Sequence, residues 1–129
     1  PRNVFVAKFM GDNNVVRGPA TANGDGTVTI RGEHATARVK GDVSGEAAMA
    51  IRASAVKVTA DGSVPAENAT RARLIFAEYL GDSVKLHLEV GGEPFIAKVD
   101  EARYADLRAF EGQDVTVGWD VEDGQILEL

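Results

Sequence analysis

Two arginines in the middle of this sequence could bind a ligand. Arg71 and Arg73 lie two positions apart in a segment expected to form a strand, so both side chains point to the same face of a sheet. Neighbouring guanidinium groups can bind a carboxylate or an oxyanion through charge-assisted hydrogen bonds. The simpler alternative is a charged face in contact with solvent, and the residue pattern favours that alternative.

Residues for catalysis or metal binding are not gathered in a recognisable pattern. The sequence has no phosphate-binding Gly-x-x-x-x-Gly-Lys-Ser/Thr loop and no cysteine, and His34 and His87 are far apart in the chain. Residues 81–83, Gly-Asp-Ser, lack the second glycine of a hydrolase nucleophile turn, so they predict a tight turn. The acidic loops 23–26 and 120–124 lack the ligand spacing of a calcium loop. We therefore expect no catalytic residue, no metal site, no cofactor and no enzymatic activity in this chain.

The overall composition is that of one acidic domain without cysteine. The chain has 129 residues, a net charge of −6 and 6% aromatic residues. A chain of this length buries one real core, while its negative charge and few aromatic residues argue against nucleic acid as a partner. No apolar run is long enough to span a bilayer and no signal peptide is recognisable, which favours a cytoplasmic location.

Alternating apolar and polar residues predict an all-β domain after a short helix. Pro1 and the spacing of Phe5 and Phe9 indicate a helix within the first ten residues. Later segments alternate with period two and are separated by Gly, Asp and Asn turns. Strands are expected at residues 27–30, 34–39, 48–52, 72–76, 83–90, 95–99, 115–119 and 125–129. They predict an OB-like antiparallel barrel of about eight to ten short strands in two lobes.

Four further features refine this arrangement. Residues 61–68 are polar and are expected to link the two lobes. Residues 101–110 carry apolar side chains three apart, which predicts a second helix or a single helical turn. Trp119 continues the alternation of its strand and is expected in the core. A weak similarity between residues 9–12 and 79–82 indicates either a duplication of whole lobes or coincidence.

Several stretches, taken in order, resemble the transport-associated OB-type (TOBE) domain at the end of ABC-importer ATP-binding subunits. Residues 1–18, PRNVFVAKFMGDNNVVRG, resemble the segment that leaves the nucleotide-binding domain in that family. Residues 49–54, MAIRAS, stand where the family has a hydrophobic strand ending in Arg-Pro-Glu, of which only Arg52 is kept. Residues 77–90 and 115–120 resemble later strands of the family.

The resemblance implies a non-catalytic regulatory and dimerisation domain of the ATP-binding subunit of an importer for a small solute, such as a polyamine or ferric ion. Residues 1–12 are then expected to be a linker helix at the end of the nucleotide-binding domain, and residues 13–129 the TOBE-type domain. Pro1 in place of an initiator methionine indicates either a piece of a longer chain or a trimmed methionine.

The implied partners are a second copy of the chain, the ATPase domain with its ATP and magnesium, and, through that domain, permease subunits at the inner membrane. Arg52 joins Arg71 and Arg73 as a candidate ligand-binding residue. The alternative function is a stand-alone module that binds a small solute or an oxyanion.

Overall fold

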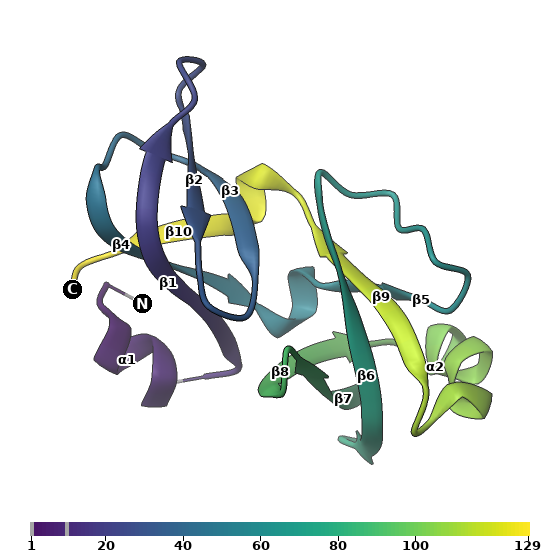
Figure 1. The fold of residues 1–129 in the computed structure, drawn as a ribbon. Coiled ribbons are helices and arrows are strands. Elements are labelled where there is room, and N and C mark those ends of the chain that lie inside the picture. Colours follow the sequence, from purple (N-terminus) through teal and green to yellow (C-terminus); the bar gives the residue numbers. More distant parts are fainter. Residues whose placement is uncertain (1, 10) are drawn as a thin grey trace.

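The computed structural model describes residues 2–9 and 11–129, apart from the side chains of Lys8 and Phe9. This part of the chain forms two five-stranded antiparallel sheets and two short α-helices (Figure 1). The elements are α1 (Val4–Phe9), β1 (Asn13–Ala22), β2 (Thr27–Arg31), β3 (Thr36–Lys40), β4 (Gly45–Arg52), β5 (Lys57–Thr59), β6 (Asn68–Tyr79), β7 (Val84–Val90), β8 (Glu93–Val99), α2 (Glu101–Leu107), β9 (Asp114–Trp119) and β10 (Gly124–Leu127).

The two sheets have the same strand order, so the chain contains two lobes of one design. The first sheet is ordered β10-β4-β1-β2-β3 and the second β5-β9-β6-β7-β8. Strands β1 to β4 therefore correspond to β6 to β9. The chain crosses between the sheets at two 3₁₀ turns, Ala53–Ala55 before β5 and Val121–Asp123 before β10. Strand β5, which follows β4 of the first sheet, thus becomes the fifth strand of the second sheet. Strand β10, which follows β9 of the second sheet, becomes the fifth strand of the first.

Alternating side chains build one apolar core that both sheets share. Strand β7 alternates between buried apolar and partly exposed polar residues, as its sequence predicts. Met49 and Ile51 of the first sheet belong to the same buried cluster as Leu74 and Trp119 of the second. Trp119 is only 1% exposed, which confirms its expected place in the core.

Helix α1 covers the outer face of the first sheet. Ala7 is fully buried and packs with Ala48 and Ala50 of β4 and with Leu127 of β10. Phe5 is 70% exposed, and the contacts of the helix with the sheet come from Ala7 and the partly buried Val4. The Val4 N–H donates to the Glu128 carbonyl at 3.2 Å, which places the two ends of the described chain side by side.

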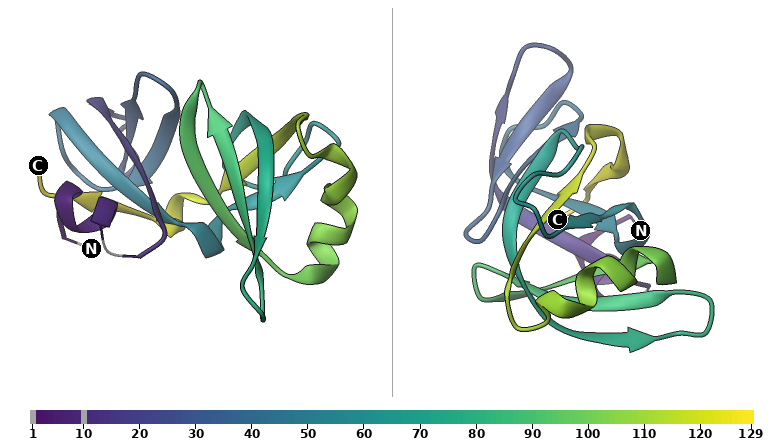
Figure 2. Two further views of the ribbon diagram at one scale, coloured as in Figure 1. Left: turned by 90° about the horizontal axis from the view of Figure 1, so that it is seen from below. Right: turned by 90° about the vertical axis from the view of Figure 1, so that its right-hand side faces the viewer.

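Helix α2 closes the far end of the second lobe, on the opposite side of the molecule from the two chain ends (Figure 2). The Asp100 carboxylate caps the helix by accepting a hydrogen bond from the Arg103 N–H at 2.7 Å. Tyr104 and Leu107 are its buried residues, and the Tyr104 ring meets the Tyr79 ring of β6 edge to face. A 3₁₀ turn at Arg108–Phe110 continues α2, which confirms the second helix expected at residues 101–110.

All eight expected strands are present, and two more strands were not expected. Strand β1 contains Gly18 and Pro19, which interrupt the pattern of a strand, and β5 is only three residues long. Strand β3 begins later than predicted, so His34 lies in the turn between β2 and β3 and not on a strand.

Two expectations about the lobes are corrected by the strand order. Residues 61–68 do not carry the chain between lobes, because the crossing at Ala53–Ala55 and strand β5 come before them. The similarity between residues 9–12 and 79–82 does not mark the duplication either. Residues 81–83 form the turn after β6, whereas residues 11–12 precede β1, and Met10 lies outside the described residues.

Candidate anion site at the lobe junction

Two buried asparagines join the lobes at equivalent places. Asn14, in β1, donates from Nδ2 to the Ile96 carbonyl and accepts from the Ile96 N–H, both at 2.8 Å. Asn68, in β6, makes the same pair of bonds to the backbone of Arg38, at 3.0 and 2.7 Å. Because β8 and β3 are the last strands of their sheets, each amide takes the place of a neighbouring strand at a free edge. We call these places the first junction, at Asn14, and the second junction, at Asn68.

A polar hollow of about 280 Å³ opens at the first junction, where the linker before β1 meets the crossover after β4. The Ala53 N–H donates to the Asp12 carbonyl at 2.9 Å and holds these two segments together. Strand β8 closes the third side. The lining residues are Gly11, Asp12, Asn13, Arg52, Ala53, Ser54 and Lys98.

The Asp12 carboxylate lies between two lysines. Its Oδ1 is 2.9 Å from Lys85 Nζ and its Oδ2 is 2.9 Å from Lys98 Nζ. The hydrogen bonds from Lys85 and then Lys98 hold the pKa of Asp12 below its usual value of 3.8. One carboxylate shared by two ammonium groups leaves one positive charge uncompensated.

Arg52 contributes a further positive charge. It is the last residue of β4, its side chain is exposed, and it makes no ion pair with any residue that the structure describes. Arg52 and Ser54 also line a neighbouring hollow of about 420 Å³, whose other residues include Glu122, Asp123 and Gln125. The guanidinium group is therefore placed between a cationic hollow and an acidic rim.

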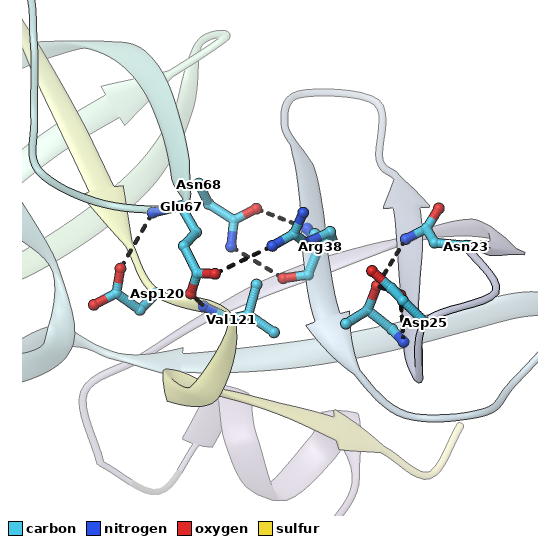
Figure 3. A network of polar contacts seen from close by, with 8 residues as sticks. Asn23, Asp25, Arg38, Glu67, Asn68, Asp120 and Val121 are labelled. Atoms are coloured by element: carbon cyan, nitrogen blue, oxygen red, sulfur yellow. Dashed lines mark hydrogen bonds and ion pairs between the residues drawn. The ribbon is translucent and has the colours of Figure 1, made fainter.

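The second junction is filled by the protein's own charges (Figure 3). Glu67 lies 3.2 Å from Arg38 through Oε2 and accepts a hydrogen bond from the Val121 N–H at 3.0 Å through Oε1. Asp120 accepts from the Glu67 N–H at 3.1 Å and lies 3.2 Å from Lys57 Nζ. These two contacts, the backbone one first, lower the pKa of Asp120 from its usual 3.8. Two carboxylates here neutralise two cations.

The junctions are therefore alike in topology and different in charge. Arg52 and Asp120 occupy the same position, the residue that precedes the 3₁₀ crossover turn. At the first junction Lys85 and Lys98 share the Asp12 carboxylate and Arg52 lines the same hollow, whereas at the second Glu67 and Asp120 each pair with one cation. A small oxyanion can be held by charge-assisted hydrogen bonds at the first junction, where cations are in excess.

Another hollow, of about 660 Å³, does not suit an anion. It lies between β1, the β2–β3 turn and β8. His34 is 3.3 Å from Glu93 and 3.8 Å from Glu33, and both carboxylates are exposed. The described residues contain no group of three or more His, Asp or Glu side chains that could hold a metal ion. None of the helices described is long and apolar enough to cross a membrane.

The candidate arginines expected from the sequence do not form one site. Arg71 and Arg73 share the outer face of β6, opposite Thr116 and Asp114 of β9, and both are exposed, as the alternation predicts. Neither lines the hollow that contains Arg52. Whether any of the three binds a ligand stays a prediction.

Sequence reasoning missed the two lysines of the first junction. Lys85 lies in β7 and Lys98 in β8, on segments far from Arg52 in the chain, and no spacing rule connects them. Ser54 lies two residues after Arg52, within the segment 49–54 that resembles the family, so its place beside Arg52 could be found from the sequence.

Comparisons with known proteins agree with this architecture. A family model described as "TOBE domain" matches residues 49–127, more than half of the chain. The chain is 27% identical over 139 positions to the "Oligosaccharides import ATP-binding protein MsmX" of Bacillus subtilis (strain 168), an alignment that covers 99% of this chain and 36% of that protein. The chain thus spans only 36% of the length of this curated relative.

A solved structure shares the fold over almost the whole chain. This is the cytoplasmic molybdate-binding protein ModG with molybdate bound, with a TM-score of 0.76, 18% identity, and coverage of 92% of this chain and 97% of that one. The family segment contains the strands from β6 to β9, both crossovers and Arg52. The chain belongs to the TOBE domain family.

Proposed function

We propose that this chain is a non-catalytic module that binds a small oxyanion at the first junction. The observation that carries the proposal is the excess of cations there, which the equivalent second junction lacks. The fold it shares with a protein described as molybdate-binding supports this ligand class.

The chemistry of binding follows from the residues that line the hollow. Arg52 offers a planar guanidinium group for paired hydrogen bonds to two anion oxygens, and Lys98 offers an ammonium group. The Ser54 hydroxyl can donate a further, neutral hydrogen bond. Asp12 competes with the ligand for Lys98, so the anion must draw this lysine partly away from the carboxylate.

Calorimetric titration with molybdate, sulfate and phosphate at fixed ionic strength tests the proposal. We expect saturable binding of at least one anion, weakened about tenfold or more in Arg52→Ala, because a hydrogen bond to a charged group contributes about 1.5–3 kcal/mol. Arg71→Ala is the matched control, since Arg71 is exposed on a different surface. Absence of binding to all three anions, or equal loss in both variants, contradicts the proposal.

A second function, regulation and dimerisation of the ATP-binding subunit of an ABC importer, is favoured by one observation. Nearly the whole chain aligns with about a third of a protein named as an import ATP-binding protein. In this proposal the remaining part of such a subunit binds ATP and magnesium, contacts the permease subunits and lies at the cytoplasmic face of the membrane. This relative is named for oligosaccharides and not for a polyamine or ferric ion, so the solute expected from the sequence stays a prediction.

The coding sequence upstream of Pro1 tests this second function. A phosphate-binding loop and an ABC signature encoded in frame before Pro1 are the expected result. A start codon directly before Pro1 contradicts it and leaves the anion-binding module standing alone.

A further inference from the structure

Four large apolar side chains that are exposed to solvent lie close together in the chain on the second lobe. Ile75, Phe76, Tyr79 and Leu80, in β6 and the turn after it, are between 39% and 60% exposed. The other large apolar side chains exposed in the described residues lie close to the two chain ends. Of these four, Tyr79 meets Tyr104 of α2, and Phe76 lies opposite His87 on the outer face of the sheet, where exposed apolar surface is typical of an interaction site.

The centre of this surface is a row that crosses three strands. Phe76 of β6 pairs with His87 of β7, and His87 pairs with Ile96 of β8. The Phe76 and His87 rings are stacked, with centroids 4.2 Å apart and planes 7° apart, and His87 Nε2 lies 2.9 Å from the Glu78 carboxylate. We call Phe76, His87 and Ile96 the aromatic row. Because stacking and the bond to Glu78 already hold the Phe76 and His87 side chains, docking on them immobilises little.

The first lobe provides an internal comparison for this row. Asn68 binds the backbone of Arg38 as Asn14 binds that of Ile96, so the equivalent row is Thr21, Thr29 and Arg38. That row is polar, and its Arg38 is already paired with Glu67. The same position on the same fold is thus apolar only on the second lobe, so the fold itself does not require the aromatic row.

The charges on the two sides of the aromatic row are of opposite sign. On β6, Arg73 precedes the row and Glu78 follows it. On β7, Glu89 pairs with Arg73 on one side of the row, and Lys85 pairs with Glu78 on the other. Nearest to the row, each strand therefore has a positive side chain on one side and a negative one on the other, and the order is reversed between β6 and β7.

We propose that the aromatic row is the docking surface for a second copy of this chain, with a two-fold axis along the row. A two-fold axis that runs along the row, perpendicular to the strands, places each residue of the row opposite its own copy. The same axis reverses the direction of the partner's strands, so a residue on one side of the row faces a partner residue from the other side. Arg73 then faces Glu78 of the partner, and Glu89 faces Lys85 of the partner, whose ammonium group also binds Asp12. The charge pattern is complementary to itself, which is what selects a second copy as the occupant.

This inference rests on the dimerisation part of the second proposed function. Its charged residues differ from Arg52, Ser54 and Lys98, which line the proposed anion site, and only Lys85 also reaches the first junction, through Asp12. Loss of anion binding in Arg52→Ala with an unchanged dimer separates the two proposals.

The first experiment measures self-association of the chain by sedimentation velocity over a series of concentrations. We expect a reversible dimer whose dissociation constant rises about 30-fold or more in Phe76→Glu, as for a buried aromatic anchor. Thr21→Glu, on the equivalent row of the first lobe, is the matched control and should leave the dimer unchanged. Circular dichroism confirms that each variant is folded. A wild-type chain that stays monomeric overturns the proposal.

The second experiment reverses the proposed charge pair. Arg73→Glu and Glu78→Arg should each weaken the dimer, because each places like charges across the axis. The double variant should restore it, since the swapped charges again face opposite ones. Arg73 and Glu78 lie on opposite sides of the row and form no ion pair with each other in the described chain, where Glu78 contacts His87 instead, so recovery must arise between copies. A double variant no tighter than the single ones overturns the proposal even if a dimer exists.

Discussion

Asp12 stabilises the folded chain through its ion pairs, and it also competes with the proposed anionic ligand for the same lysines. Its carboxylate binds Lys85 and Lys98, the two lysines of the first junction. In Asp12→Asn both ammonium groups lose their anionic partner, so an oxyanion no longer competes with a carboxylate. We expect tighter anion binding by this variant in the same calorimetric titration. Asp106→Asn, an exposed carboxylate on α2, is the control and should not change the affinity.

The effect of Asp12→Asn on the stability of the folded chain should depend on pH. The pKa of Asp12 is lower in the folded chain than its usual 3.8, so its ion pairs add stability that is fully present above pH 3.8. This contribution is lost as the pH falls through the lower, folded-state pKa. Thermal unfolding should therefore show Asp12→Asn below the wild type at neutral pH, with the difference disappearing in strong acid. A difference that persists unchanged in acid would assign the effect to packing instead.

At the scale of elements, the two asparagines decide how the sheets meet. Asn68→Ala leaves the N–H and carbonyl of Arg38 without their partner at a partly buried strand edge. We expect a loss of about 1–3 kcal/mol in unfolding free energy, measured by equilibrium urea denaturation. Asn14→Ala should have a similar effect through Ile96. Asn23→Ala removes two exposed side-chain bonds in the β1–β2 hairpin, to Thr27 and Thr29, and should cost clearly less because water can replace them.

Elements with a regular pattern could be predicted from the sequence, and elements defined by distant contacts could not. Strand β7 alternates without interruption and was expected almost to the residue. Strand β1 was not, because Gly18 and Pro19 look like a turn, although pairing with β4 along its length makes it a strand. The Gly18 position is tight, since a Cβ there would lie 2.3 Å from the Arg31 carbonyl oxygen.

The candidate site shows the same division. Arg52 was recognised as a candidate because it remains from a family motif. Its surroundings depend on a crossover, a linker and a strand edge that meet only in the folded chain. The exchange of β5 and β10 between lobes also has no local signal, because period-two alternation reports which face is buried and not which strand lies alongside.

At the scale of the whole molecule, the exchanged strands predict that the two lobes unfold together. Strand β10 leaves the second lobe to pair with β4, and β5 leaves the first to pair with β9, so neither sheet is complete without the other. Ile51 of the first sheet and Trp119 of the second also share one buried cluster. Independent unfolding of one lobe would remove an edge strand from its neighbour.

Trp119, the single tryptophan, makes this cooperativity measurable. It is buried in the second sheet, so its fluorescence follows that lobe, whereas far-ultraviolet circular dichroism follows both. Ile51→Ala, in the first sheet, should lower the unfolding free energy by about 2–5 kcal/mol, the range for large-to-small core substitutions. Both probes should shift to the same urea midpoint, because the loss is shared by one cooperative unit. Thr29→Ala, on the outer face, is the control. If fluorescence kept its wild-type midpoint while circular dichroism shifted, the lobes would be independent and the strand exchange would carry no coupling between them.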